Sequence, residues 1–291
     1  MIALSVVVPA EAAHDVRPAL DRLAPAVASL GVAAEILVAS PAPLAAPVAG
    51  VRHVPAPRPG YGAALAAGVA AARGAWILTI DADVLEPATV LRDLWARRDD
   101  ADVVIASRYV PGGEAHMPAW RVRGSRRLNR LFGRGLSLGV RDMSSGVRLY
   151  RAKVLAAVGT LPDGLDALQT VLVKVYAEGW SVLEVPFVYR VAPDGVSHER
   201  ASRFARDYLR TFWHLWRLRN SIECADYDAR AHDSAIPLQR YWQRERHRHV
   251  TELIAGEGPV LDVGCGSSRI IGALPPGSVA VDVLLRKLRY A

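Results

Sequence analysis

Short apolar runs alternate with longer helix-like stretches along the first two thirds of the chain. Apolar runs with the length of buried strands occupy residues 5–8, 35–38, 76–80, 102–106 and 181–189. Stretches with the apolar spacing or alanine content of helices occupy residues 16–30, 62–73 and 165–178. The proline-rich stretch 41–59 is expected to form a loop over the sheet. Strands that alternate with helices in this way predict an α/β domain with a mostly parallel sheet.

Two acids end one of these apolar runs. Residues 76–83 read WILTIDAD, so Asp81 and Asp83 follow directly after a predicted buried strand. On extended backbone, side chains at i and i+2 point to the same face, so both carboxylates can reach one hard cation. Parallel strands place ligands at their carboxyl ends, where these two acids are expected to lie. A polar turn that leaves the core is the alternative, because turns also favour aspartate.

The composition is that of a globular protein with a basic surface. Of the 291 residues, 51% are apolar, which suffices for a packed core, and the formal net charge is +7. Two cysteines far apart in the chain, Cys224 and Cys265, indicate no disulfide framework. No basic segment precedes the first apolar run, and no run approaches the ~20 residues of a spanning helix. We therefore expect a cytoplasmic protein that reaches the inner membrane face, if at all, as a peripheral protein.

Further motifs accompany the acid pair between residues 5 and 197. They are SVVVP at the first strand, PGYGAALAAGVAAARGAWILTIDAD, ASRYVPGG at 106–113, RDMSSGVRLYR at 141–151, EVPFVYR at 184–190 and GVS at 195–197. A spaced set lies among them and consists of Trp120, Arg121, Ser125 and Asn129. In this order the motifs resemble the family 2 glycosyltransferases, and within them the polyprenyl-phosphate sugar synthases such as dolichol-phosphate mannose synthase.

The resemblance implies a glycosyltransferase A-type fold, which is Rossmann-like, and sugar transfer with inversion of the anomeric centre. It also implies a UDP- or GDP-linked sugar as donor and a lipid-linked phosphate as acceptor. A Mg or Mn ion held by Asp81 and Asp83 would neutralise charge on the departing diphosphate. The acceptor phosphate is already anionic at neutral pH, so the reaction needs cations to hold it more than it needs a general base.

The same resemblance assigns roles to individual residues. The implied catalytic residues are Asp81, Asp83, Asp142 and Arg121, of which the first two are also the metal ligands. The implied donor- and acceptor-binding residues are Pro9, Gly60, Gly62, Arg108, Ser145, Arg148, Arg190 and Ser197. Arginine suits phosphate because its planar fork donates two parallel hydrogen bonds, and glycine lets backbone N–H groups come close to a ligand. Ordinary ion-pairing arginines, a plain glycine-rich helix start and a turn role for Asp142 remain the alternatives.

The chain departs from the family pattern mainly in the nucleotide half. Residues 11–13 read Glu-Ala-Ala where the family has Tyr-Asn-Glu, and Ser-Pro at 40–41 replaces two aspartates, one of which binds the base. Leu85 replaces a glutamine, Thr170 a glutamate and His198 a lysine. These losses leave a catalytically silent, glycosyltransferase-like scaffold as an alternative function.

Two segments, 120–134 and 204–219, mix arginines with aromatic and aliphatic residues. On a helix, the second segment would align one stripe of residues, Phe204, Tyr208, Phe212 and Leu215. Such a helix either lies on an anionic membrane surface or packs on its own domain. Basic charge also suits nucleic acid, but no recognised motif accompanies it, so we expect no nucleic-acid partner.

A second pattern follows a linker expected at 221–240. Residues 241–291 read as a helix, then PVLDVGCGSSRIIGAL, then VAVDV. Asp262, Gly264 and Gly266 form a glycine turn, and Asp282 follows the next strand, where an acid can accept ribose hydroxyls. The pattern resembles the start of a class I S-adenosylmethionine-dependent methyltransferase, which is also Rossmann-like.

This second pattern is too short for a complete domain of its kind, because some fifty residues cannot build the full sheet. The expected organisation is a glycosyltransferase domain at 1–220 and an incomplete methyltransferase-like segment at 241–291. We expect S-adenosylmethionine binding only if the natural chain continues beyond Ala291. A first domain that only selects substrate for a fused methyltransferase is a further alternative.

Overall fold

The computed structural model describes residues 1–10, 16–44, 46–190 and 198–291, with only the backbone described at 198–205. It contains two compact units. The first unit comprises Met1–Leu172 and Val182–Leu215, and the second comprises Val173–Ser181 and Trp216–Ala291. The second unit thus includes a segment that the sequence assigns to the first domain. Neither unit contains, among the described residues, a helix long and apolar enough to cross a membrane.

The described part of the first unit contains a central sheet with the strand order β3-β2-β1-β4-β7-β5-β8. Its strands are β1 Leu4–Pro9, β2 Ala34–Ser40, β3 Val51–Pro55, β4 Trp76–Thr79, β5 Val103–Ser107, β7 Arg148–Arg151 and β8 Val182–Pro186. Neighbours pair in parallel except at β7, which is antiparallel to β4 and β5. The predicted α/β fold with a mostly parallel sheet is therefore confirmed.

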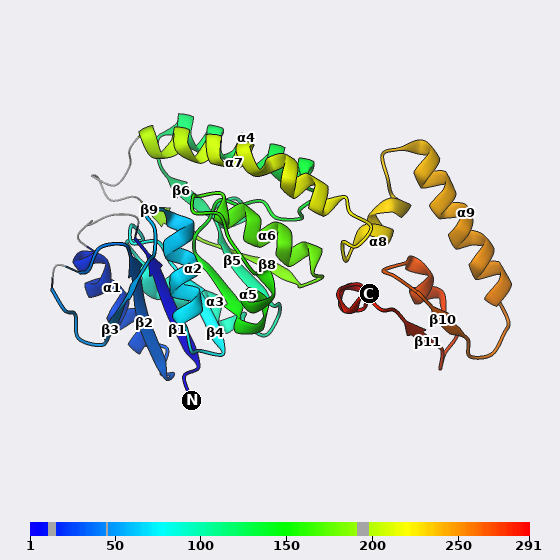
Figure 1. Cartoon of the computed structure of the whole chain (residues 1–291), viewed down its shortest axis with the longest axis horizontal. Helices are drawn as coiled ribbons and strands as arrows, with labels where there is room; N and C mark the ends of the chain where they lie inside the picture. Colours follow the sequence, from blue (N-terminus) through cyan, green and yellow to red (C-terminus); the bar gives the residue numbers. More distant parts are fainter. Residues whose placement is uncertain (11–15, 45, 191–197) are drawn as a thin grey trace. The chain divides into compact units, whose positions relative to one another are not determined.

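Helices cover both faces of this sheet (Figure 1). The helices α1 Arg17–Ala28 and α3 Pro87–Ala96 share one apolar cluster with alternate residues of β1, such as Val6 and Val8. Val7 points to the other face, where α2 Tyr61–Ala71 approaches so closely that a Cβ on Gly68 would lie 2.4 Å from Val7 Cγ1. The alternation along β1 is thus that of a strand buried on both faces.

The predicted positions of the strands need correction at three places. The stretch 41–59 is not a loop throughout, because β3 pairs with β2 inside it, and Pro55 is tolerated there since β3 lies at the edge of the sheet. The apolar pattern does not predict β7, which has only four residues and begins and ends with arginine. The predicted strand 181–189 is two strands, β8 and β9 Val188–Arg190, and β9 pairs with β6 Glu114–His116 in a separate sheet.

The two basic aromatic segments form helices that run side by side, α4 Ala119–Gly135 and α7 His198–Arg219 (Figure 1). Phe132 of α4 makes edge contacts with Tyr208 and Phe212 of α7, with ring centroids 5.5 and 5.4 Å apart. Tyr208 and Leu215 are buried. The stripe predicted on α7 therefore packs on its own domain, although the Phe204 side chain lies outside the described atoms.

The remaining helices of the first unit are α5 Ala152–Val158 and α6 Ala167–Ala177, and the end of α6 belongs to the second unit. The other elements of the second unit are α8 Tyr227–His232, α9 Pro237–Ile254, β10 Leu261–Val263, the 3-10 helix η1 Arg269–Ala273, β11 Val279–Val281 and α10 Leu285–Tyr290. The strands β10 and β11 form a parallel pair. Few apolar side chains are buried here, and α9 buries none.

Candidate functional site

The acid pair lies at the centre of one edge of the main sheet. From β1 the chain builds β2 and β3 on one side and then returns to place β4 on the other side of β1. Ligands of open α/β sheets bind at such a reversal of strand order, beyond the carboxyl ends of the strands. Pro9 ends β1 there and is buried, and Asp81 and Asp83 follow the end of β4. The predicted position of both acids is thus the position that the topology favours for a ligand.

Asp83 uses one carboxylate oxygen within the protein and leaves the other without a partner. Its Oδ2 accepts a hydrogen bond of 2.7 Å from the hydroxyl of Tyr189 on β9. Its Oδ1 is buried and has no hydrogen-bond partner among the described residues. Burial raises the pKa of Tyr189, and the nearby carboxylate of Asp83 raises it further, so Tyr189 stays a proton donor. A buried, unpaired carboxylate oxygen is costly unless a cation occupies its free side.

Asp81 occupies a space that exists because residue 146 is glycine. A Cβ on Gly146 would lie 2.5 Å from Asp81 Oδ2 and 2.6 Å from Oδ1. Tyr61, which is buried at the start of α2, lies next to the same carboxylate, and burial together with the charge of Asp81 raises the pKa of Tyr61. The carboxylate of Asp81 therefore lies between the loop that precedes β7 and the start of α2.

These residues fit a divalent cation that is shared with a substrate. Carboxylate oxygens suit Mg and Mn. Within the described ranges, no cluster of three or more His, Cys, Asp or Glu side chains is placed to hold a metal alone. Two carboxylates supply part of a coordination shell, and substrate phosphates and water commonly complete such a shell.

Arg108, directly after β5, and Asp142, in the loop before β7, form a bidentate ion pair. The guanidinium carbon of Arg108 lies 5.5 Å from the ring centre of Tyr189, which contacts Asp83. Arg108 Nε donates to Asp142 Oδ2 and Nη2 donates to Oδ1, both at 2.7 Å. The backbone N–H of Arg108 and the hydroxyl of Ser144 donate to the same carboxylate. Asp142 is fully buried, and the Arg108 side chain is 12% exposed. Although burial opposes ionisation, the Arg108 charge and these hydrogen bonds hold the pKa of Asp142 below its usual value.

Two further side chains hold the loop that carries Asp142. Asn129 Oδ1 accepts from the backbone N–H of Met143 at 2.9 Å, and its Nδ2 donates to Ser144 Oγ at 3.1 Å. The carboxylate of Glu184 accepts from the backbone N–H groups of residues 141 and 142. Glu184 and Tyr189 are absent from the predicted site residues. Their only signal in the sequence is their place in the motif EVPFVYR.

Arg148 is a correction to the predicted binding set. The side chain is fully buried, and it donates to the backbone carbonyls of Met143, Ser145 and Leu168. It therefore has no surface with which to contact a donor or acceptor, and it positions the 143–145 loop instead. Ser145 is also buried, at 5% exposed, and its hydroxyl accepts from the N–H of Val147.

The two glycines before and within α2 approach the protein's own chain. Gly60 has a φ of +129°, and a Cβ there would lie 2.3 Å from the carbonyl oxygen of Asp163. The N–H of Gly62 donates to that same oxygen at 2.8 Å. The space beside these glycines, which was predicted to admit a phosphate or sugar, is thus filled by the backbone of the loop at 162–164.

The remaining predicted arginines lie nearer the surface. Arg190 is exposed and pairs with Glu86 at the start of α3. Arg121 lies in the first turns of α4, with its guanidinium carbon 5.7 Å from the centre of the Trp120 ring. Ser197 lies outside the described residues.

Two of the sequence departures are accommodated by local hydrogen bonds. Ser40, which stands where the family has an aspartate, donates to the carbonyl of Ala42 at 2.6 Å and lies 3.0 Å from His53 Nε2. Thr170 donates to the carbonyl of Asp166 within α6. Neither side chain is left without a partner.

The methyltransferase-like turn is occupied by the chain's own carboxylates. Gly264 and Gly266 both have positive φ values, and the N–H of Gly266 donates to Asp282 Oδ2 at 2.8 Å. Asp228 of α8 lies so close that a Cβ on Gly266 would be 2.5 Å from its Oδ2. Asp262 is half-buried on β10. The S-adenosylmethionine role of this turn stays a prediction.

Comparisons with known proteins agree with this fold. Residues 42–159 match the family model of glycosyl transferase family 2. An uncharacterized glycosyltransferase of Mycobacterium tuberculosis is 30% identical over 158 residues, which cover 51% of this chain and 67% of the relative. A dolichol-phosphate mannosyltransferase of Pyrococcus furiosus is 28% identical and a polyprenol monophosphomannose synthase of Mycolicibacterium smegmatis 34% identical. Those two matches cover 56% and 47% of this chain, and 47% and 55% of the respective relatives.

A solved structure shows the same fold. Glucosyl-3-phosphoglycerate synthase of Mycobacterium tuberculosis, solved with Mn²⁺, UDP and glucosyl-3-phosphoglycerate, superposes with a TM-score of 0.55 at 19% identity. The superposition covers 74% of this chain and 80% of that one. The central α/β fold, the acid pair beyond β4 and these similarities lead to one conclusion: this chain is an enzyme that belongs to glycosyltransferase family 2.

Proposed function

We propose that this chain transfers a sugar from a nucleoside diphosphate donor to an acceptor phosphate, with a Mg or Mn ion at Asp81 and Asp83. One observation carries the proposal. Asp83 Oδ2 is fixed by Tyr189, while its buried Oδ1 has no hydrogen-bond partner among the described residues. That arrangement fits an oriented metal ligand, because ligating carboxylates are commonly held in place by a hydrogen bond to their second oxygen. The Mn²⁺ and UDP named for the related synthase structure support the same donor class.

The proposed reaction is one in-line displacement with inversion. An oxygen of the acceptor phosphate forms a bond to the anomeric carbon, and the bond from that carbon to the donor diphosphate breaks. When bound, the cation supplies Lewis-acid neutralisation of the charge on the departing diphosphate. Asp81 and Asp83 hold that corner of the site. No general base is required, since the acceptor phosphate is already anionic.

The acceptor is proposed to be a polyprenyl-type lipid phosphate. Two relatives carry names of enzymes that act on dolichol phosphate or polyprenol phosphate. Exposed apolar side chains on α4 and α7 support a lipid, notably Trp120 at 52%, Leu131 at 64% and Trp213 at 67% exposed. Arg121, beside Trp120, is the proposed phosphate contact, and Arg190 is a second one if its pair with Glu86 opens. The enzyme would then work as a peripheral protein on the cytoplasmic membrane face.

Arg108 and Asp142 are proposed to act on the acceptor side as a pair. Every oxygen of Asp142 already accepts hydrogen bonds, so this carboxylate is not free to take a proton from substrate. Its proposed role is to fix the guanidinium of Arg108 in place. Asp142 takes Nε and Nη2, and Nη2 also donates to Ser144 Oγ at 2.7 Å, so the N–H groups of Nη1 are the ones proposed to meet an anion.

A silent scaffold is the second candidate, and Ser40 is the observation that favours it. At this position the family binds the nucleotide base with an acid, whereas here the hydroxyl is engaged with Ala42 and lies close to His53. A scaffold would show no turnover with any donor. The active enzyme is expected to tolerate the change by binding its donor mainly through the diphosphate.

The test is a transfer assay with labelled UDP-linked and GDP-linked sugars, polyprenyl phosphate in detergent, and Mn²⁺, Mg²⁺ or EDTA. We expect label in the organic phase with at least one donor, lost with EDTA and in Asp83→Asn. No transfer with any donor and metal would favour the silent scaffold. Transfer to a water-soluble phosphate acceptor but not to polyprenyl phosphate would overturn the lipid part of the proposal alone.

A further inference from the structure

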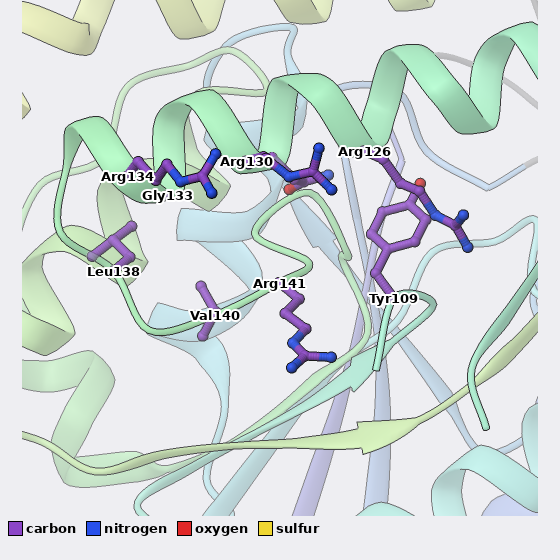
Figure 2. Close-up of a pocket in the computed structure, with 9 residues that line it drawn as sticks. Tyr109, Arg126, Arg130, Gly133, Arg134, Leu138, Val140 and Arg141 are labelled. Carbon is purple, nitrogen blue, oxygen red and sulfur yellow. The ribbon is translucent and has the colours of Figure 1, made fainter. Parts of the chain in front are cut away.

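A pocket of about 410 Å³ lies between α4 and the loop that follows it (Figure 2). Its polar lining consists of Tyr109, Arg126, Asn129, Arg130, Arg134 and Arg141. Three of the four arginines stand on successive turns of α4, at i, i+4 and i+8, so they share one face of the helix. Leu138 and Val140 form the apolar floor on the loop. The volume falls in the range of about 300–1,000 Å³ that is typical of small-molecule sites.

The positive charge of this pocket is not neutralised within the described part of the chain. The pocket lining contains four arginines and no acid. None of the four makes a salt bridge to a described carboxylate. Arg108 and Arg190, by contrast, each pair with an acid. Arg126 instead lies over the ring of Tyr109, with its guanidinium carbon 5.3 Å from the ring centre. Clustered like charges are unfavourable, and an anion between them relieves that cost.

Two acids beside Arg141 are already engaged elsewhere. Asp142, directly after Arg141, is held by Arg108 in a bidentate pair. Glu184, which touches the backbone of residues 141 and 142, accepts their N–H groups with both of its oxygens. Among the described residues, the guanidinium groups of the pocket thus make no ion pair and remain open to a ligand.

We propose that this pocket binds a phosphoryl group. Several guanidinium forks around one space match an anion with oxygens in several directions, because each fork can donate two hydrogen bonds. The site is separate from the proposed metal site and from Arg121, which does not line the pocket. Asn129 connects the two regions, since it lines the pocket and also donates to Ser144 in the Arg108 network. The phosphoryl group belongs either to a soluble phosphate compound or to the headgroup of an anionic lipid.

The test measures binding of inorganic pyrophosphate by calorimetry at an ionic strength of about 0.15 M and without divalent ions. The test variant is Arg130→Gln/Arg134→Gln. The control is Arg123→Gln/Arg127→Gln, which removes the same charge from exposed positions of the same helix outside the pocket. We expect the test variant to bind pyrophosphate at least about tenfold more weakly than the wild type, because charge-assisted hydrogen bonds are lost. The control should bind within about twofold of the wild type, since distant exposed charges are screened.

A second arm identifies the source of the phosphoryl group. The wild type, which has all four pocket arginines, and both variants are cosedimented with vesicles. Vesicles of phosphatidylcholine with phosphatidylglycerol are compared with vesicles of phosphatidylcholine alone. Pocket-dependent binding to the anionic vesicles without pyrophosphate binding assigns a lipid headgroup, and the reverse assigns a soluble phosphate. Equal losses in the test and control variants, or no binding in either arm, would overturn the proposal.

Pyrophosphate binding in the pocket and the proposed sugar transfer can be tested independently of each other. Asp83→Asn should abolish metal-dependent donor binding and leave metal-free pyrophosphate binding unchanged, because Asp83 does not line the pocket. Metal-free pyrophosphate binding that is tighter in Asp83→Asn than in the wild type would place the anion beside that carboxylate, because the substitution removes a repelling charge, and would contradict the pocket assignment. Circular dichroism and thermal unfolding of every variant confirm that each one is folded.

Discussion

The hydroxyl of Tyr189 donates to Asp83 Oδ2 at 2.7 Å and thereby joins two segments that are 106 residues apart in the chain. The contact ties the short strand β9 to the loop that follows β4. It fixes the orientation of a carboxylate whose other oxygen is buried and unpaired among the described residues. The geometry of the proposed metal site therefore depends on a residue outside the Asp-x-Asp motif.

Tyr189→Phe removes this hydrogen bond and leaves the ring in place. We expect the affinity for Mn²⁺ in the presence of donor to fall by about 10–100-fold, as is typical when the support of a metal ligand is lost. Titration of Mn²⁺ by electron paramagnetic resonance measures the change. Tyr241→Phe, at an exposed position of α9, serves as the control and should have no effect. Unchanged Mn²⁺ affinity in Tyr189→Phe would show that the contact does not orient a ligand.

Gly146→Ala should displace the carboxylate of Asp81. The added methyl would come within 2.6 Å of both carboxylate oxygens, which is closer than van der Waals contact allows. Because small displacements of a reacting group reduce rates strongly, we expect transfer to fall by roughly 10–100-fold in a folded protein. Gly124→Ala is the matched control, since nothing lies within 4 Å of its Cβ position on α4. That control should retain activity and gain up to about 1 kcal/mol of helix stability.

Asp142→Asn should destabilise the first unit, because it leaves the nearly buried Arg108 without its counter-charge. Breaking a buried pair in this way costs roughly 3–5 kcal/mol, whereas Asp100→Asn in the exposed Arg97–Asp100 pair should cost less than about 1 kcal/mol. Urea unfolding at pH 7 measures both. Equal losses of unfolding free energy in the two variants would contradict the larger contribution expected from the buried Arg108–Asp142 pair.

The same pair predicts an acid limb of stability. The folded-state pKa of Asp142 lies below its usual value, so the pair stabilises the protein above the unfolded pKa of about 3.9. That contribution is lost as the pH falls through the folded pKa. The difference in unfolding free energy between wild type and Asp142→Asn should therefore shrink below about pH 4. A difference that is independent of pH down to unfolding would contradict this assignment.

Asp166 should give the opposite dependence on pH. Burial, with the neighbouring charge of Asp207 as the second cause, raises the pKa of Asp166 to about 6. The unfolded chain loses this proton near pH 4 and the folded chain only near pH 6, so the free energy of unfolding falls as the pH rises between those values. Asp166→Asn should remove this slope, and Asp93→Asn, exposed on α3, should not. Chemical unfolding at half-unit pH steps measures it, and a slope that persists in Asp166→Asn would reject the explanation.

The position of the acid pair is predictable from the sequence because the signals are local. An apolar run and two acids two residues apart suffice to place Asp81 and Asp83 at the end of a buried strand, and alternation of strands with helices gives the α/β fold. The contacts of those acids are not local. Tyr189 comes from a three-residue strand that lies 106 residues later in the chain. Its role follows only from the pairing of β6 with β9.

The features that the sequence does not predict have the same physical origin. β7 joins the centre of the sheet although it is short and framed by arginines, because β4 and β5 cover it on both edges. Arg148 matches an arginine position of the family, yet the fold turns it inward to three backbone carbonyls. A motif fixes the residue type at a position, whereas burial, which depends on the whole fold, decides whether that residue meets a ligand.

A metal-dependent donor site at Asp81 and Asp83 can be tested by calorimetric titration of UDP-linked and GDP-linked sugars, with Mn²⁺ and with EDTA. We expect at least one donor to bind the wild type with Mn²⁺, and this binding to disappear with EDTA and in Asp83→Asn, which keeps the fold. Donor binding that is the same with EDTA, or the same in Asp83→Asn, would contradict a metal site at Asp81 and Asp83. Absence of binding by every donor would contradict the assignment of a sugar transferase.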